Sequence, residues 1–145
     1  LLIGEKTAEN VKIAIGGVIE DEPMEAEVRG RDLVTGLPRQ VIVTDADIRE
    51  AIMPSILALV DGIKEVLETT PPELLSDIMH RGLVISGGGA LLRGIDILLQ
   101  NALKIPVYMA EDPLTAVARG TGVILDDFEN YKEVLVNTQD DRTPR

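Results

Sequence analysis

The sequence predicts an α/β fold from two patterns and from its composition. A short apolar run at residues 83–85 leads into three glycines at 87–89, after which apolar residues recur at helical spacing. A second apolar run at 105–109 is followed by Asp-Pro at 112–113, a typical helix start. The chain of 145 residues is 45% hydrophobic but 2% aromatic, so aliphatic side chains must form its core, as where helices cover a parallel sheet. The order strand, helix, strand, helix predicts a parallel strand pair.

The first elements are predicted to be a helix and an acidic loop. Residues 5–15 place apolar side chains on one helical face, and the glycines at 16–17 supply a stop. Residues 19–27 are mostly acidic and contain Pro23, so we interpret them as a solvated loop that enters a strand rather than as a metal site.

A β-hairpin and a long helix are expected next. Residues 24–31 and 39–44 have extended patterns, and the segment between them contains the Gly and Pro that a chain reversal needs. Thr44, with an acidic residue three positions later, predicts a helix cap. Apolar residues then keep a helical period as far as Leu67, and Pro54 is expected to kink this helix.

Two further helices and a terminal segment complete the prediction. Prolines at 71–72 end the long helix, and residues 73–79 predict a short helix before the strand. The helix opened by Asp-Pro is expected to turn its apolar residues inward, namely Leu114, Val117, Ala118, Val123 and Ile124. Residues 137–145 are polar without periodicity and are predicted to be frayed.

The three glycines after the first apolar run are the strongest candidate for a binding site. Without Cβ atoms at 87–89, a flat or charged ligand can approach the backbone closely. The pattern places these glycines at the N-terminus of a helix, where free N–H groups and the helix dipole favour phosphate or ribose oxygens. Glycines also make tight strand-to-helix turns for packing reasons alone, and the local pattern leaves both interpretations open.

Charge and composition exclude several classes of protein. With a formal net charge of -11, the chain lacks the clustered Lys and Arg that bind a phosphate backbone, so we expect no nucleic-acid partner. It has no Cys, which suits a reducing cytoplasm and excludes a disulfide framework. No apolar run approaches the roughly 20 residues that cross a bilayer. The chain begins with Leu1, in mid-pattern, so we expect it to be part of a longer polypeptide.

No single charged residue predicts catalysis. His80, the lone histidine, precedes a strand and is expected to have a surface or packing role. Glu111 and Asp112 come before Pro113, where negative charge favours a helix start. Arg93 is either a phosphate contact or a solvated helix residue.

Five segments, in order, resemble the MreB family of bacterial actin homologues. They are GEKTAE at 4–9, EVRGRDLVTGLP at 27–38, TPPEL at 70–74, ISGGGALLRG at 85–94 and AEDPLTAVARGTG at 110–122. The resemblance implies part of the fold shared by actin, hexokinase and heat-shock chaperone ATPases, in which two lobes close on ATP and Mg²⁺. Residues 1–80 would be the outer subdomain of the second lobe, residues 81–128 part of its inner, nucleotide-facing subdomain, and residues 129–145 a partly disordered C-terminal extension.

The resemblance also implies a nucleotide site. In the family, the adenosine end of ATP lies between a helix with a Glu-x-x-Lys pattern and the glycine-rich turn. The matching residues are Glu9 and Lys12 in the first helix and Gly87, Gly88, Gly89, Ala90 and Leu91 in the turn. Glu9 and Lys12 are three apart on one helical face, where the carboxylate can take a ribose hydroxyl and the Lys stem can cover the adenine. Without the resemblance, a solvated helix pair is the alternative.

The phosphate loops and Mg²⁺ ligands of the family are expected N-terminal to Leu1, because the chain contains no Asp-x-Gly-Gly-Gly-Thr segment. In-line phosphoryl transfer needs both. This chain is therefore expected not to hydrolyse ATP alone, whereas the intact protein would be a slow ATPase coupled to polymerisation.

The function implied by the resemblance is that of an ATP-dependent filament protein, cytoplasmic and at the inner face of the cell membrane, which organises cell-wall synthesis in rod-shaped bacteria. Its partners would be copies of itself, cell-wall elongation and membrane morphogenesis proteins, and the membrane surface through the first lobe. The loop at 36–38 and the acidic outer subdomain are candidates for filament contacts. Two alternatives are a chaperone-type ATPase lobe of the same fold and an interaction module with no nucleotide cycle.

Overall fold

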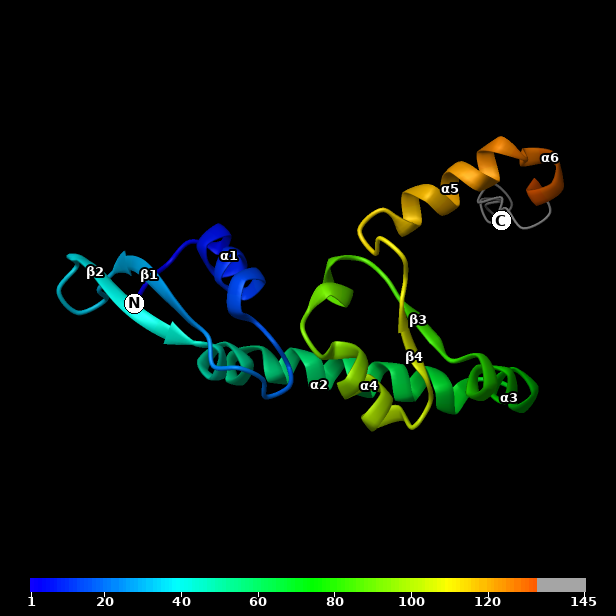
Figure 1. Ribbon diagram of the computed structural model, residues 1–145, viewed down its shortest axis with the longest axis horizontal. Helices are drawn as coiled ribbons and strands as arrows, with labels where there is room; N and C mark the ends of the chain where they lie inside the picture. Colours follow the sequence, from blue (N-terminus) through cyan, green and yellow to red (C-terminus); the bar gives the residue numbers. More distant parts are fainter. Residues whose placement is uncertain (133–145) are drawn as a thin grey trace, which may run out of the picture.

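The long helix α2 forms the spine of the chain (Figure 1). The computed structural model describes residues 1–132. A hairpin and helix α1 lie toward one end of α2, and a pair of parallel strands with helix α4 lies along its other half. The elements, in order, are α1 (Glu5–Ile15), β1 (Glu25–Arg31), β2 (Pro38–Thr44), α2 (Asp45–Thr69), α3 (Pro72–Arg81), β3 (Leu83–Ile85), the 3₁₀ turn η1 (Gly88–Leu91), α4 (Ile95–Leu103), β4 (Val107–Met109), α5 (Ala116–Asp126) and α6 (Phe128–Tyr131).

The predicted β-hairpin is confirmed, and its turn is held by one aspartate. Strands β1 and β2 pair antiparallel along their whole length. The Asp32 carboxylate accepts the N–H groups of Val34 and Thr35 at 2.8 and 3.1 Å, and Arg39 donates to it at 2.9 Å. Gly36 takes a positive φ of 73°, which a side chain would strain. The sequence therefore specifies this reversal locally.

Helix α2 begins at the predicted cap. The Thr44 hydroxyl accepts the N–H of Asp47 at 3.2 Å, and the Asp47 carboxylate accepts the N–H of Thr44 at 2.8 Å, so the two residues form a capping box. The helix then continues through Pro54 as a single element and ends at Thr69, before the prolines. The short helix predicted after it is α3, which starts at Pro72.

The core is aliphatic, as the composition predicts, and it lies between the middle of α2, α4 and β4. Its buried members are Val18, Val60, Ile95, Leu99 and Val107. Partly buried residues of α2 pack against them, namely Ile52, Ile56 and Ile63. One cluster of side chains therefore joins the first and second halves of the chain.

The two short strands pair in parallel, which confirms the predicted α/β arrangement. Leu83 lies opposite Val107, and Ile85 lies opposite Met109. Between the strands the chain passes through the glycines and α4, so the unit is a strand, a helical crossover and a second strand.

The predicted helix after the glycines is wrong in its starting point. The glycines lead into the short turn η1, three residues intervene, and α4 begins only at Ile95. Gly94 causes the break, because its φ of 77° is left-handed and cannot continue a helix. The glycines therefore do not lie at the N-terminus of α4. The expectation that the dipole of this helix favours a ligand at the glycines is wrong.

The predicted start of the last long helix is also wrong. Helix α5 begins at Ala116 rather than at Asp112-Pro113, because Asp112 adopts a positive φ of 44°. The expected inward side chains are largely at the surface, with Leu114 65% and Val117 73% exposed. The predicted fraying of residues 137–145 lies outside the described residues.

Candidate functional site

The first part of the candidate site is the exposed face of α1. Glu9 and Lys12 both lie on this helix and are exposed, three positions apart and so on neighbouring points of one face. Within residues 1–132 neither side chain forms an ion pair. A carboxylate and an ammonium group are therefore presented side by side to solvent.

The second part is the segment Gly87–Leu91, which we call the glycine corner. It follows β3 directly, and Gly87 turns the chain with a φ of 80°. Within the corner, Ala90 is buried, whereas Leu91 is 51% exposed. The corner lies in a short 3₁₀ turn and not at the end of a long helix.

Among the described residues, little packs over the glycines of the corner. A Cβ added at Gly87 or Gly89 would meet no atom within 4 Å, and one at Gly88 would only touch Leu114 at 3.7 Å. Gly94 is the opposite case, because its added Cβ would lie 2.4 Å from Ile19. The folded chain itself needs neither Gly88 nor Gly89 to lack a side chain. A flat ligand laid against this backbone would need both, so the residues present fit the adenosine end of a nucleotide.

A loop that the sequence analysis did not assign to the site supports the corner from behind. The N–H of Gly87 donates to the Pro113 carbonyl at 2.8 Å, and the N–H of Ala110 donates to the Ile85 carbonyl at 2.9 Å. Asp112, with its positive φ, accepts the hydroxyl of Thr115. Asp adopts a positive φ more readily than most residues, so Asp112 itself is the local signal in the sequence that could have indicated this loop.

Arg93 fits neither of the two interpretations that the sequence left open. Its guanidinium donates to the carbonyls of Ile15 and Gly16 at 2.8 and 3.1 Å. These are carbonyls at the C-terminal end of α1, where cations are favoured. Arg93 therefore ties α1 to the chain that leaves the glycine corner. The partner carbonyls are 77 and 78 positions away in sequence, so no local pattern indicates this role.

The clearest pKa shifts belong to structural carboxylates. Hydrogen bonds from Val34, Arg39 and Thr35 lower the pKa of Asp32 to about 2. The pKa of Asp45 is lowered chiefly by the N–H of Met24, and that of Asp47 by Thr44. These groups hold the hairpin and the start of α2, so they do not indicate acid–base chemistry.

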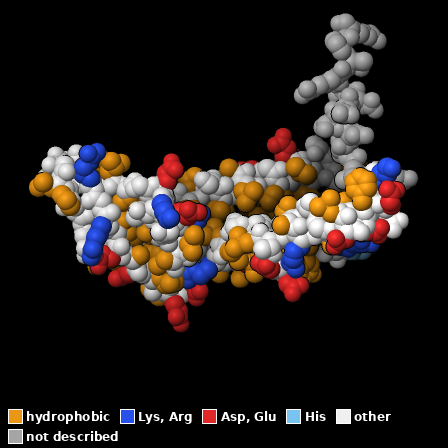
Figure 2. All heavy atoms as spheres, turned by 90° about the horizontal axis from the view of Figure 1, so that it is seen from above, with side chains coloured by type: hydrophobic (Ala, Val, Ile, Leu, Met, Phe, Trp, Pro, Cys, Tyr) orange, Lys and Arg blue, Asp and Glu red, His pale blue; other side chains and the backbone are white. Residues whose placement is uncertain are grey.

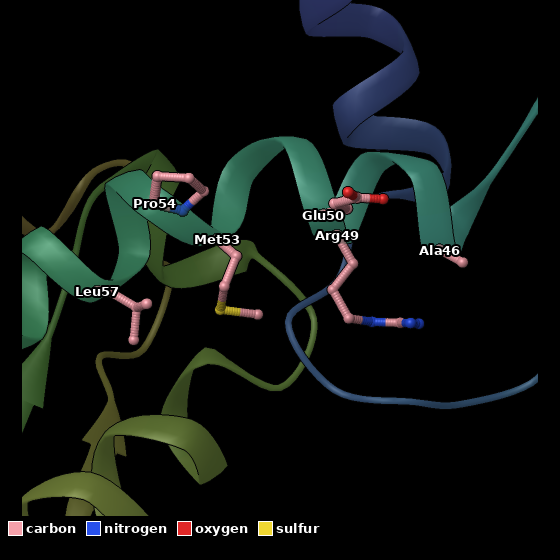
Figure 3. A pocket seen from close by; sticks show the side chains of 6 residues that line it. All are labelled: Ala46, Arg49, Glu50, Met53, Pro54 and Leu57. Atoms are coloured by element: carbon pink, nitrogen blue, oxygen red, sulfur yellow. The ribbon is translucent and has the colours of Figure 1, made fainter.

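Two grooves lie on α2, and neither includes the candidate residues. One, of about 390 Å³, is lined by Ala46, Arg49, Glu50, Met53, Pro54 and Leu57 (Figure 3). The other, of about 450 Å³, lies between α2, α3 and the start of β3.

Metal and membrane features can be stated for the described part of the chain. Within residues 1–132, no group of three or more His, Asp or Glu side chains is arranged to hold a metal ion. No helix among these residues is both long and apolar enough to cross a bilayer. His80 is exposed at the end of α3.

The mixed α/β arrangement, with its glycine corner after a parallel strand, is part of an actin-like fold. It superposes with a TM-score of 0.85 on MreB5 of Spiroplasma citri bound to ADP, at 36% sequence identity, over 90% of this chain and 40% of that one. MreB5 bound to AMPPNP gives a TM-score of 0.84 over 92% and 40% of the two chains.

The chain belongs to the MreB/Mbl protein family, whose model matches residues 1–133. It is 51% identical over 130 residues to the cell shape-determining protein Mbl of Bacillus subtilis, covering 89% of this chain and 39% of Mbl. It is 50% identical over 131 residues to the cell shape-determining protein MreB of Escherichia coli K12, covering 90% and 38%. The chain thus spans about two fifths of the length of the relatives it matches, and the resemblance found in the sequence is confirmed.

Proposed function

We propose that the chain is part of the second lobe of an ATP-dependent, actin-like filament protein that controls rod shape by organising cell-wall synthesis. The observation that supports this most directly is the open glycine corner, in a chain that superposes on MreB5 in both an ADP and an AMPPNP complex. The Mbl and MreB relatives are cell shape-determining proteins.

In this proposal the nucleotide lies between α1 and the glycine corner. Glu9 accepts a ribose hydroxyl, and the stem of Lys12 covers one face of the adenine. Gly87, Gly88 and Gly89 let the other side approach the backbone, with Ala90 and Leu91 completing that wall. Bound ATP would supply the phosphoryl group that is transferred to water, and Mg²⁺ would neutralise the charge on its phosphates; the Mg²⁺ ligands are expected in residues outside this chain.

The same proposal divides the chain and assigns partners. Residues 1–80 form the outer subdomain and residues 81–128 contribute to the inner one, whereas most of the expected C-terminal extension, 129–145, lies outside the described residues. Further copies of the protein add head to tail, since a heterologous contact that does not close builds a filament. Cell-wall elongation and membrane morphogenesis proteins bind the filament, which lies in the cytoplasm at the inner face of the membrane.

The proposal is tested by titration of a fluorescent ATP analogue and by sedimentation with and without ATP. The full gene product is expected to bind the analogue and to pellet only with nucleotide, and both properties should weaken in Glu9→Gln and Lys12→Ala. Arg29→Ala, on the exposed hairpin, is the matched control for analogue binding. Binding without pelleting, together with peptide-stimulated ATPase activity, would favour the chaperone alternative. No binding at all would favour the interaction module.

A further inference from the structure

The crossing between residues 15–21 and residues 93–94 joins the two parts of the candidate site. The first segment of this crossing, residues 15–21, follows directly from α1, the helix that carries Glu9 and Lys12. The second follows directly from the glycine corner. The N–H of Val18 donates to the carbonyl of Arg93 at 2.9 Å, and Gly17 and Arg93 form an isolated parallel bridge. We call α1 and the glycine corner the two walls of the candidate site. The contacts at this crossing relate the position of one wall to that of the other.

The side chain of Arg93 doubles this backbone connection. It donates from two different nitrogens to the adjacent carbonyls of Ile15 and Gly16, and Asp21 lies 3.8 Å from its third nitrogen. A planar guanidinium can serve two neighbouring carbonyls at once, whereas an ammonium group is a single point charge. The contact therefore fixes the direction of the end of α1 as well as its distance.

The packing at the crossing leaves little freedom for adjustment. Gly94 lies so close to Ile19 that a Cβ would come within 2.4 Å of it, and a Cβ at Gly17 would lie 3.4 Å from the Cβ of Arg93. Val18, between them, is buried in the core. The two chain segments are thus in close contact, and Arg93 orients one on the other.

Among the described residues, Arg93 makes the polar contacts that join the segment around α1 to the segment after the glycine corner. Within residues 1–132, every recorded hydrogen bond or ion pair between residues 1–24 and residues 82–132 involves Arg93. Arg49 holds the same loop from another side, since it donates to the Ile19 carbonyl at 3.2 Å and pairs with Asp45. Arg49 fastens that loop to α2, not to the glycine corner, and so provides a matched control.

We propose that Arg93 is a positioning residue for the nucleotide: without touching it, Arg93 holds α1 at the separation from the glycine corner that lets one adenosine contact both. This inference rests on the proposed function. If α1 and the glycine corner are already held in place, no free energy is spent on ordering them when the nucleotide binds. Loss of Arg93 should therefore lower nucleotide affinity although Glu9, Lys12 and the glycines are intact.

The first measurement is a distance and needs no nucleotide. The chain contains no Cys, so Asn10→Cys on α1 and Ser86→Cys beside the corner give one pair of spin labels within it. Pulsed electron paramagnetic resonance should give a narrow distance distribution with Arg93 present and a clearly broader one in Arg93→Ala. Arg49→Ala should leave it narrow. An unchanged distribution in Arg93→Ala would overturn the proposal.

The second measurement is affinity for the fluorescent ATP analogue in the full gene product, well below the unfolding temperature of each variant. Arg93→Ala should lower affinity on the order of tenfold, because α1 must then be ordered against the glycine corner when the nucleotide binds. Arg49→Ala should stay within about twofold. Arg93→Lys, which keeps charge and stem, serves if the Ala variant does not fold, and it should lie between wild type and Ala. Equal affinity in wild type and Arg93→Lys, or equal losses in the Arg93 and Arg49 variants, would contradict the positioning role.

The two measurements separate the two proposals. A broadened distance in Arg93→Ala together with no analogue binding by the wild type would overturn the proposed nucleotide site but leave Arg93 as the clasp between α1 and the corner. Normal analogue binding by the wild type, with an unchanged spin-label distance distribution in Arg93→Ala, would overturn only the positioning role of Arg93.

Discussion

At the scale of single residues, Asp32 shows how a partly buried carboxylate can specify a turn. The pKa of Asp32 is lowered to about 2 because the N–H of Val34 donates to the carboxylate, with Arg39 and the N–H of Thr35 adding to the effect. A carboxylate whose pKa is lower in the folded state stabilises that state above its unfolded pKa. The tip of the hairpin therefore depends on the ionised form.

The first prediction concerns the pH dependence of this turn. Its stabilisation should be complete above pH 3.8 and should be lost progressively as the pH falls from 3.8 toward about 2. The carboxyl carbon of Asp32, followed by NMR, should titrate near the lower value. Asp32→Asn should abolish the pH dependence of amide protection at Val34 in this range. A midpoint near 3.8 for Asp32 would mean that the turn is not held as described.

The second prediction contrasts two glycines. Gly94→Ala should destabilise the chain by about 2 kcal/mol or more, because the site has a left-handed φ and Ile19 occupies the space of a Cβ. Gly89→Ala should leave the unfolding free energy within about 0.5 kcal/mol. It should nevertheless lower affinity for the ATP analogue on the order of tenfold, because the Cβ would stand where the ligand approaches. Chemical unfolding and analogue titration of both variants give the comparison, and full affinity in Gly89→Ala would exclude the proposed approach.

At the scale of elements, α2 depends on a short-range signal at its first turn. Thr44→Ala should lower the free energy of unfolding by about 1 kcal/mol, because the N–H of Asp47 loses the hydroxyl that caps it. Thr44→Ser retains the hydroxyl and should cost much less. Urea unfolding followed by circular dichroism measures both, and equal losses would indicate that the threonine methyl group, not the cap, is responsible.

The elements that the sequence predicts correctly are those with local signals. The turn at Asp32, the cap at Thr44 and the prolines after α2 each act within four residues, so one stretch of sequence contains both partners. The start of α4 is different. Gly94 breaks the helical pattern with its left-handed φ, and Ile19, from a distant segment, occupies the space of a Cβ there, whereas a periodicity count continues through this position.

The candidate site divides in the same way. The glycine corner is visible as a run of three glycines, whereas the crossing that relates it to α1 depends on contacts between residues more than 70 positions apart. The outward apolar residues of α5 were predicted to face inward because periodicity identifies an apolar face but not what covers it. Of the residues predicted to face inward, Val117 and Val123 are exposed.

At the scale of the whole molecule, apolar side chains are spread over much of the visible surface (Figure 2). On β3, β4 and α5 the exposed members include Val84, Tyr108, Met109, Val117 and Leu125. A two-stranded parallel sheet is ordinarily covered on both faces. Because the chain spans about two fifths of its relatives, we propose that the rest of the protein covers this surface.

The core of the described chain nevertheless connects its two halves, and this leads to the last prediction. Leu99 is 1% exposed and packs in one cluster with Val18, Val60 and Val107, which come from both sides of the proposed boundary at residue 80. Leu99→Ala should therefore lower the unfolding free energy by about 2–5 kcal/mol and accelerate native-state amide exchange in the centre of α2 as well as in β4. Val34→Ala, at a side chain that is 94% exposed, is the control and should change neither. Faster exchange confined to α4 and β4 would instead mean that the halves unfold separately, and that the shared cluster does not couple the site-bearing segments on either side of it.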